Sequence, residues 1–107
     1  MADLFVYGTL REKSLLCRLT GKDFSATRAC LEGFRKFTSR FGYPYVVPRK
    51  GFKVVGRLIR DVDEQSLKKL DQYENEGRSY SRKKVIVIAA GKKTVCEVYV
   101  GNEKVLR

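Results

Sequence analysis

The sequence predicts an α+β fold, in which a small mixed, mostly antiparallel β-sheet curls toward a barrel and is flanked by helices. Three observations support this. Several short segments rich in β-branched and aromatic residues are separated by turn residues, as strands usually are. Residues 61–73 instead repeat apolar side chains at helical spacing. Glycines interrupt some strand segments, as happens where a sheet bends. The pattern alone leaves a curled sheet and a closed barrel as alternatives.

The length of 107 residues predicts a single domain, residues 1–107, because the chain is long enough for one hydrophobic core and too short for two. Its hydrophobic fraction of 43% is that of a folded protein. No apolar run approaches the roughly 20 residues of a membrane span. The first residues also lack the basic start and long apolar run of a signal peptide. We therefore expect a cytoplasmic protein without a membrane partner.

Residues 4–10, LFVYGTL, are expected to form a buried strand that runs into a loop, because the apolar run breaks at Gly8 and Thr9. Because Gly8 has no Cβ, a ligand could approach the main chain there. The N–H groups that follow, together with the Thr9 hydroxyl, could hold a carboxylate or phosphate. On spacing alone, a simple turn at the end of a strand is the plainer interpretation.

Residues 11–19 are predicted to form a short helix, because leucines recur at i, i+1 and i+4 and Ser14 could cap the start. The stretch 20–23 ends this helix. Residues 24–39 favour β structure but contain Gly33. We therefore predict either two strand pieces or one strand that bends at Gly33 through a bulge.

Two further segments of β character follow. Pro44 and Pro48 bias residues 43–48 toward extended geometry and withhold ladder donors, which predicts an edge or wall and not a central strand. Residues 54–59 are predicted to form the next strand, with a bend at Gly56.

The clearest helix is expected at residues 61–73, with either Asp61 or Asp63 as its N-cap. Its apolar side chains recur three apart on one face: Leu67, Leu70 and Tyr73. Glu74 comes directly after this stripe and is expected at the rim of the buried face. Two strands, 84–89 and 94–100, then form a hairpin through the loop 90–93, and residues 101–102 end the domain.

The chain has three cysteines and no histidine. The cysteines are far apart in sequence, so we expect neither a disulfide nor a zinc site but free, mostly buried thiols: Cys17, Cys30 and Cys96. The absence of histidine excludes Ser-His-Asp triads, Cys-His dyads and histidine metal sites. Any chemistry must therefore use carboxylates, tyrosines, lysines or the backbone.

The net charge of +11 raises the question of a polyanionic partner. The basic residues are spread along the chain and often alternate with apolar ones, which favours a solvated surface. A nucleic-acid surface is the alternative.

Three short motifs resemble the gamma-glutamylcyclotransferase-like family, also called AIG2-like. Residues 7–10 match its Tyr-Gly-Ser/Thr-Leu strand and loop, and residues 42–48, GYPYVVP, match its Gly-x-Pro-x-Val-x-Pro connection. Residues 70–82 resemble its Leu-Asp-x-Tyr/Phe-Glu-Gly segment, which is followed by a tyrosine and a basic strand. The motifs occur in the family's order and span most of the chain.

The resemblance implies a small mixed-strand barrel with flanking helices and a pocket near the loop at residues 7–10. It also implies intramolecular acyl transfer, in which the α-amine of a gamma-glutamyl compound attacks its own γ-carbonyl. The products are 5-oxoproline and an amine or amino acid. Because the nucleophile is tethered to the carbonyl that it attacks, the reaction requires no metal, cofactor or covalent nucleophile from the protein. The partner that the resemblance implies is a small-molecule gamma-glutamyl substrate.

Matching the motifs places the family's catalytic glutamate on Glu74, six residues before the matching tyrosine, Tyr80. Asn75 replaces the family's usual glycine, and Glu76 leaves a second candidate for the base. The pKa of a free glutamate lies about 3.5 units below that of an α-amine, a gap worth about 5 kcal/mol. Burial at the helix end would narrow it.

The resemblance further implies that Tyr7, Gly8, Thr9 and Leu10 bind the glutamyl carboxylate through their main chain. It implies that Tyr80 binds the substrate or orients Glu74. Tyr43 and Tyr45 could line the pocket, and Arg82 matches a common basic position. The competing class is a non-catalytic module whose basic strands and aromatic residues bind nucleic acid or another polyanion. The leaving group and the oligomeric state stay open.

Overall fold

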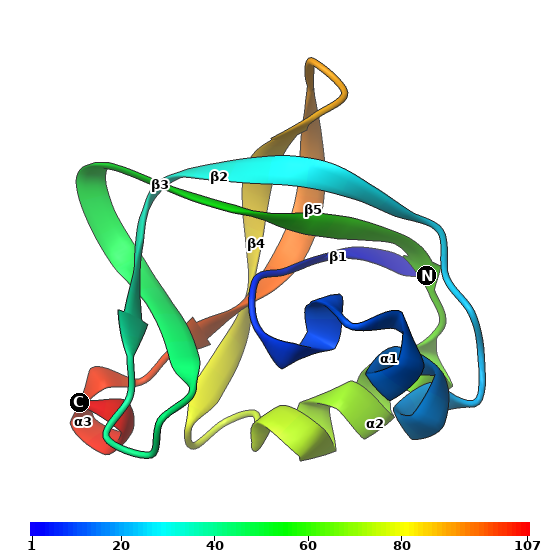
Figure 1. The fold of residues 1–107 in the computed structure, drawn as a ribbon, viewed down its shortest axis with the longest axis horizontal. Helices are drawn as coiled ribbons and strands as arrows, with labels where there is room; N and C mark the ends of the chain where they lie inside the picture. The colour runs from blue at the N-terminus through cyan, green and yellow to red at the C-terminus, as the bar shows by residue number, and fades with distance from the viewer.

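A computed structural model describes residues 1–107 and shows a closed five-stranded barrel flanked by helices (Figure 1). The strands are β1 (Ala2–Val6), β2 (Ala26–Thr38), β3 (Pro44–Val62), β4 (Tyr80–Ala89) and β5 (Lys92–Gly101). Their order around the barrel is β1-β3-β2-β4-β5. All neighbours pair antiparallel except β1 and β5, which pair in parallel and close the barrel. The predicted α+β class with a mixed, mostly antiparallel sheet is confirmed.

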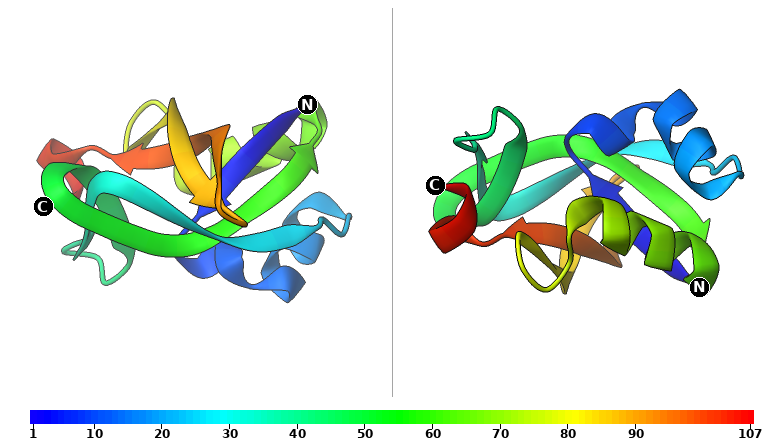
Figure 2. Two further views of the ribbon diagram at one scale, coloured as in Figure 1. Left: turned by 90° about the horizontal axis from the view of Figure 1, so that it is seen from above. Right: turned by 90° about the horizontal axis from the view of Figure 1, so that it is seen from below.

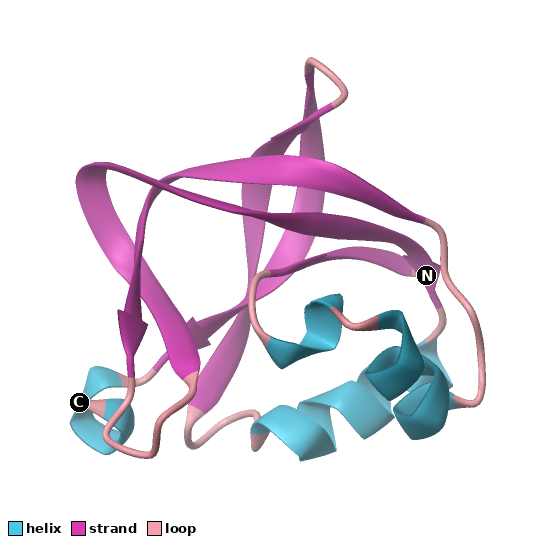
Figure 3. Ribbon diagram, in the orientation of Figure 1, coloured by secondary structure: helices cyan, strands magenta, loops and turns pink.

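The helical segments are η1 (Thr9–Arg11), α1 (Lys13–Thr20), α2 (Glu64–Glu74) and α3 (Glu103–Leu106). Figure 3 shows η1, α1 and α2 together beneath β1, whereas α3 lies beside the loop between β2 and β3. Two of these elements, η1 and α3, are absent from the sequence prediction. None of the helices has the length and apolar composition that a membrane span requires.

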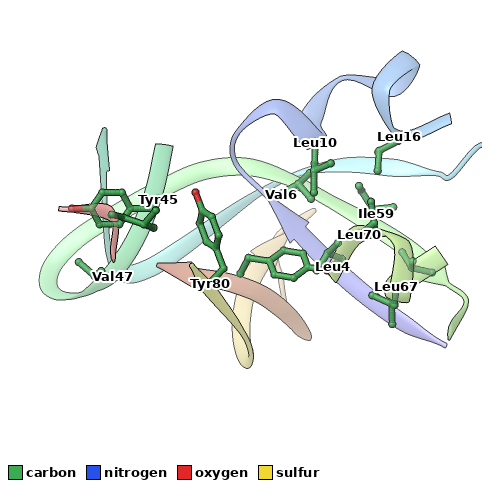
Figure 4. Packing of buried hydrophobic residues seen from close by; sticks show 13 residues of the cluster. Leu4, Val6, Leu10, Leu16, Tyr45, Val47, Ile59, Leu67, Leu70 and Tyr80 are labelled. Atoms are coloured by element: carbon green, nitrogen blue, oxygen red, sulfur yellow. The ribbon is translucent and has the colours of Figure 1, made fainter. Parts of the chain in front are cut away.

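Strand β1 is buried on both faces, as its continuous apolar sequence predicts. Leu4 lies toward the helices, where it meets Leu67 and Leu70 of α2 (Figure 4). Phe5 and Tyr7 lie on the opposite face, in the cluster that fills the barrel. Full burial of a large apolar side chain contributes roughly 1.5–3 kcal/mol. The strand therefore joins the barrel interior to the helical layer.

Strand β2 is continuous and bends at Gly33, which has φ +81 and lies at a register shift against β3. The predicted bulge is thus confirmed. The two predicted pieces at residues 43–48 and 54–59 prove to be parts of the single strand β3. The prediction of an edge still holds locally, because the part from Pro44 to Pro48 pairs only with β2. Proline is tolerated at such an unpaired edge.

Of the two aspartates predicted as candidates for the N-cap of α2, Asp63 occupies that position, directly before the first helical residue, Glu64. The Asp63 carboxylate accepts hydrogen bonds from the Ser66 hydroxyl at 2.6 Å and from the Ser66 backbone N–H at 3.2 Å. The Ser66 hydroxyl bond is the main reason that the pKa of Asp63 falls to about 2. For α1 the predicted cap is wrong: Glu12 occupies the N-cap position, and Ser14 lies inside the helix.

The C-terminal end of the chain differs from the prediction. The domain does not end at residues 101–102, because Asn102 caps α3 and Leu106 is completely buried. The Leu106 carbonyl also accepts a hydrogen bond from the Arg40 N–H at 2.9 Å. The hairpin turn between β4 and β5 is shorter than predicted and consists of Ala90 and Gly91, both at positive φ.

All three cysteines are free, but only Cys96 is buried. Cys30 is partly buried and Cys17 is exposed. The expectation of mostly buried thiols is therefore wrong, because Cys17 lies on the outer side of α1.

Replacement of Leu106 by alanine should lower the free energy of unfolding by about 2–5 kcal/mol, because it leaves a cavity in the core. Chemical denaturation would measure the change, with Lys104→Ala on the exposed side of α3 as the matched control. A loss below about 1 kcal/mol for Leu106→Ala would contradict the assignment of α3 to the core.

Candidate active site

A cavity of about 410 Å³ opens where the loop after β1, the end of α2 and the start of β4 meet. Its lining includes the residues for which the resemblance implies a catalytic or substrate-binding role: Tyr7, Gly8, Thr9, Leu10, Glu74 and Tyr80. Tyr43, which was expected near the pocket, also lines the cavity. The remaining lining residues were not predicted to do so: Phe5, Val6, Pro44, Tyr73, Asn75, Ser79 and Tyr99. The fold thus brings together motifs that are more than 60 residues apart in the sequence.

Glu74 is the only charged residue that lines the cavity. It is the last residue of α2 and lies one turn beyond the fully buried Leu70, so the packing of the helix places its side chain at the cavity wall. The carboxylate forms no hydrogen bond or ion pair within the chain. Burial raises the pKa of Glu74 from 4.5 to about 7.

Asn75 ends α2 in the left-handed conformation, with φ 54 and ψ 51. Its backbone N–H donates to the carbonyls of Asp71 and Gln72, and its side-chain amide donates to the Ser79 hydroxyl at 3.1 Å. Glycine is the usual residue at such a C-cap, and asparagine is the common substitute. The departure from the family's glycine therefore preserves the backbone turn that follows Glu74.

Glu76 lies outside the cavity. Its side chain is exposed and accepts a hydrogen bond from the backbone N–H of Arg82 at 3.3 Å. The left-handed turn at Asn75 separates the two glutamates, because Asn75 itself lines the cavity whereas Glu76, the next residue, does not. Of the two candidates for the base, only Glu74 faces the space where a substrate would fit.

The loop at residues 7–10 presents main-chain donors at the cavity. The N–H groups of Tyr7 and Gly8 donate no hydrogen bond within the chain. Those of Thr9 and Leu10 lie in the first turn of η1, which leaves them without an acceptor in that helix. The Thr9 hydroxyl is 3.1 Å from the hydroxyl of Tyr73, so this side chain links η1 to α2.

Gly8 adopts a negative φ of −121, so a left-handed conformation does not explain the glycine. A Cβ at this position would instead lie 2.8 Å from Cγ of Pro44, a contact that would force the proline to shift. Pro44 is itself part of the cavity wall. Gly8 is thus needed for close packing between the loop and the first residue of β3.

Tyr80 is buried, and its hydroxyl donates to the carbonyl of Pro44 at 2.8 Å. Burial, and to a lesser extent the charge of Glu74, raises the pKa of Tyr80. Its hydroxyl is therefore bonded to the main chain and not to Glu74 in this structure. Of the two tyrosines expected near the pocket, Tyr43 lines the cavity, whereas Tyr45 is buried against Phe37.

A second group of polar residues supports the cavity from behind. Tyr99 lines the cavity, and its hydroxyl donates to Asp71 at 2.6 Å. Arg82 in turn binds both Asp71 and Glu97 at 3.2 Å. Arg82 therefore belongs to an ion-pair network, and its partners were not predicted from the sequence.

Comparison with known proteins agrees with the motifs. A family model described as "Gamma-glutamyl cyclotransferase, AIG2-like" matches residues 4–107. AIG2-like protein C of Arabidopsis thaliana is 33% identical over 105 residues, which make up 95% of this chain and 60% of that protein. The chain thus spans less than two-thirds of that relative.

Two solved structures show the same fold. An AIG2-like protein from Mus musculus has a TM-score of 0.82 at 28% identity, over 96% of this chain and 78% of that one. A protein of Arabidopsis thaliana solved in solution has a TM-score of 0.85 at 25% identity, over 95% of this chain and 70% of that one.

Replacement of Asn75 by glycine should change the free energy of unfolding by less than about 1 kcal/mol, because glycine accepts the left-handed conformation. Asn75→Val should cost about 2 kcal/mol or more, because a β-branched residue is strained at positive φ. Thermal unfolding would measure both variants. Equal stability of the two variants would show that this turn does not constrain the end of α2.

Proposed function

Because this chain belongs to the gamma-glutamyl cyclotransferase, AIG2-like family, we propose that it closes a small gamma-glutamyl compound into 5-oxoproline and releases an amine or amino acid. The observation that carries the proposal is the position of Glu74, a lone carboxylate with a raised pKa in the wall of a cavity. Perturbed carboxylates in cavities are typical of general acids and bases. Since the chain covers only part of its relatives, the proposal concerns this domain.

The proposed reaction forms one C–N bond and breaks another. The α-amine nitrogen attacks the γ-carbonyl carbon, and Glu74 accepts the proton that the attacking nitrogen loses. The tetrahedral intermediate then collapses, and the bond to the leaving nitrogen breaks. Glu74 returns its proton to that nitrogen, so the carboxylate is regenerated. The ring closure needs no nucleophile from the protein, because both reacting atoms belong to the substrate.

The raised pKa of Glu74 fits this role. A glutamate at its usual pKa would face a gap of about 3.5 units to an α-amine near 8, which costs about 5 kcal/mol. With the pKa of Glu74 at about 7, the gap falls to about 1 unit, or about 1.4 kcal/mol. Proton transfer in both directions then requires little free energy, as a residue that acts as base and acid requires.

The loop at residues 7–10 is proposed to hold the α-carboxylate of the substrate. No lysine or arginine lines the cavity, so a bound carboxylate must be neutralised by main-chain N–H groups. The N–H groups of Tyr7 and Gly8 donate no hydrogen bond within the chain and are free to bind a carboxylate. The N–H groups of Thr9 and Leu10, in the first turn of η1, are further donors. Tyr80 is proposed to support the wall beside this loop by holding Pro44, which packs against Gly8, in place.

The first test is a screen of gamma-glutamyl amines and gamma-glutamyl amino acids for release of 5-oxoproline. Glu74→Gln removes the proton acceptor but keeps the size of the side chain, so turnover should fall by roughly 10² to 10⁴. Substrate binding, measured by calorimetry, should change little.

Glu76→Gln is the matched control, since this glutamate lies two residues away and outside the cavity. It should retain normal turnover. Loss of activity in Glu76→Gln with full activity in Glu74→Gln would overturn the assignment of the base. Absence of 5-oxoproline release from every compound would reject the proposed reaction.

A further inference from the structure

The far part of the β2–β3 hairpin carries a concentration of positive charge. Beyond the bend at Gly33, residues 34–53 continue as a two-stranded ribbon, seen at the left of Figure 1 and in both views of Figure 2. Part of this ribbon is buried in the core through Tyr45, Val46 and Val47, whereas its basic side chains are exposed. We call this segment the outer ribbon. The sequence has no aspartate or glutamate from residue 33 to residue 60. The outer ribbon itself contains six basic residues: Arg35, Lys36, Arg40, Arg49, Lys50 and Lys53.

Arginine and phenylalanine side chains form a connected cluster on this ribbon. The guanidinium carbon of Arg35 lies 4.9 Å from the ring centre of Phe37 and 4.7 Å from that of Phe52. That of Arg49 lies 5.6 Å from the ring centre of Phe37. Contacts of this kind attract a guanidinium group to the ring face while its charge remains.

The arginines of the cluster have no acceptor within the protein. The guanidinium groups of Arg35 and Arg49 form no hydrogen bond or ion pair with another residue. The same holds for the guanidinium group of Arg40, which lies over Phe41. Each guanidinium carries five N–H donors in a planar fork that suits phosphate oxygens. The ribbon thus offers unused guanidinium donors, each beside a phenylalanine ring, in a region without negative charge.

We propose that the outer ribbon binds single-stranded nucleic acid. Phosphates would contact the guanidinium groups of Arg35 and Arg49, and bases would stack on exposed rings of the ribbon. Phe52 is 44% exposed and Phe41 is 55% exposed, so both rings have accessible surface. Binding by salt-sensitive charge contacts together with stacking is characteristic of proteins that hold single strands.

An anionic membrane surface is the competing partner, and the cluster favours nucleic acid over it. Aromatic residues that anchor a protein to a membrane insert their rings among the lipids. Here a guanidinium group lies over each of three rings, those of Phe37, Phe41 and Phe52. Insertion of a ring among the lipids would have to pull it away from the charged guanidinium group. A base, in contrast, adds a further planar group to an existing stack.

The proposed surface is separate from the proposed active site. Arg35, Arg49 and Phe52 do not line the cavity. Substitutions at the two arginines should therefore leave any turnover unchanged, so that the two proposals fail or succeed independently. Tyr43 stacks on Phe41 but also lines the cavity, and for that reason it is unsuitable for the test.

The test measures binding of a fluorescein-labelled, 20-nucleotide single strand of mixed sequence by fluorescence anisotropy. The full chain is compared with Arg35→Ala/Arg49→Ala across a range of salt concentrations. Loss of two phosphate contacts should weaken binding at least about 10-fold and reduce the slope of log K against log salt by about 1.4. Circular dichroism would show that the variant is folded.

Two further variants separate the cluster from net charge alone. Lys92→Ala/Lys93→Ala removes the same charge at the exposed start of β5 and should weaken binding less than about 3-fold. Arg35→Lys/Arg49→Lys keeps the charge but removes the planar guanidinium groups, with their forked N–H donors and their stacking on the phenylalanine rings. This variant should bind several-fold more weakly than the natural chain. Equal losses in the two double alanine variants, or unchanged binding in the lysine variant, would overturn the proposal. Tighter binding to vesicles containing 30% phosphatidylserine than to the oligonucleotide would overturn it in favour of a membrane.

Discussion

The packing of Leu67 and Leu70 of α2 against β1 determines where the two parts of the candidate site lie relative to each other. β1 is followed directly by the loop at residues 7–10, and α2 ends directly at Glu74. Because both elements are buried against the same cluster, their ends meet at one cavity. The left-handed residue Asn75 then turns the chain toward β4, where Tyr80 also lines the cavity. A change in this contact would separate the loop from the carboxylate.

The acidic residues of this region differ in what their surroundings do to them. Asp71 and Glu97 are neutralised by Arg82, and Asp63 is bound by Ser66 at the start of α2. Only the carboxylate of Glu74 is partly buried without a hydrogen-bond donor or a positive charge beside it, and this burial destabilises its charged form. Such an arrangement costs stability and is therefore expected where a carboxylate has a chemical role. The neighbouring hydroxyls of Tyr7 and Tyr80 are bonded to main-chain carbonyls, so they shape the cavity, and Glu74 is the only carboxyl group that lines it.

Much of the site could be predicted because local sequence determines its parts. The apolar run of β1, the helical spacing of α2 and the glycine bend of β2 each follow from side-chain patterns, and the family motifs link them. The continuity of β3 through two prolines could not be predicted, because it depends on pairing with β2 along one edge only. The burial of Leu106 and the contact of Gly8 with Pro44 depend on segments distant in sequence. Network partners such as Tyr99 and Glu97 were missed for the same reason.

The central claim is that the fold places the carboxyl group of Glu74 where burial makes it a base suited to neutral pH. Carbon-13 NMR of glutamate side chains during a pH titration tests this claim most directly, with the Glu74→Gln variant identifying the resonance. The account predicts a midpoint at about pH 7 for Glu74 in the unliganded protein. A midpoint near 4.5, the usual value for glutamate, would contradict the account, because it would show a solvated carboxylate at the end of α2.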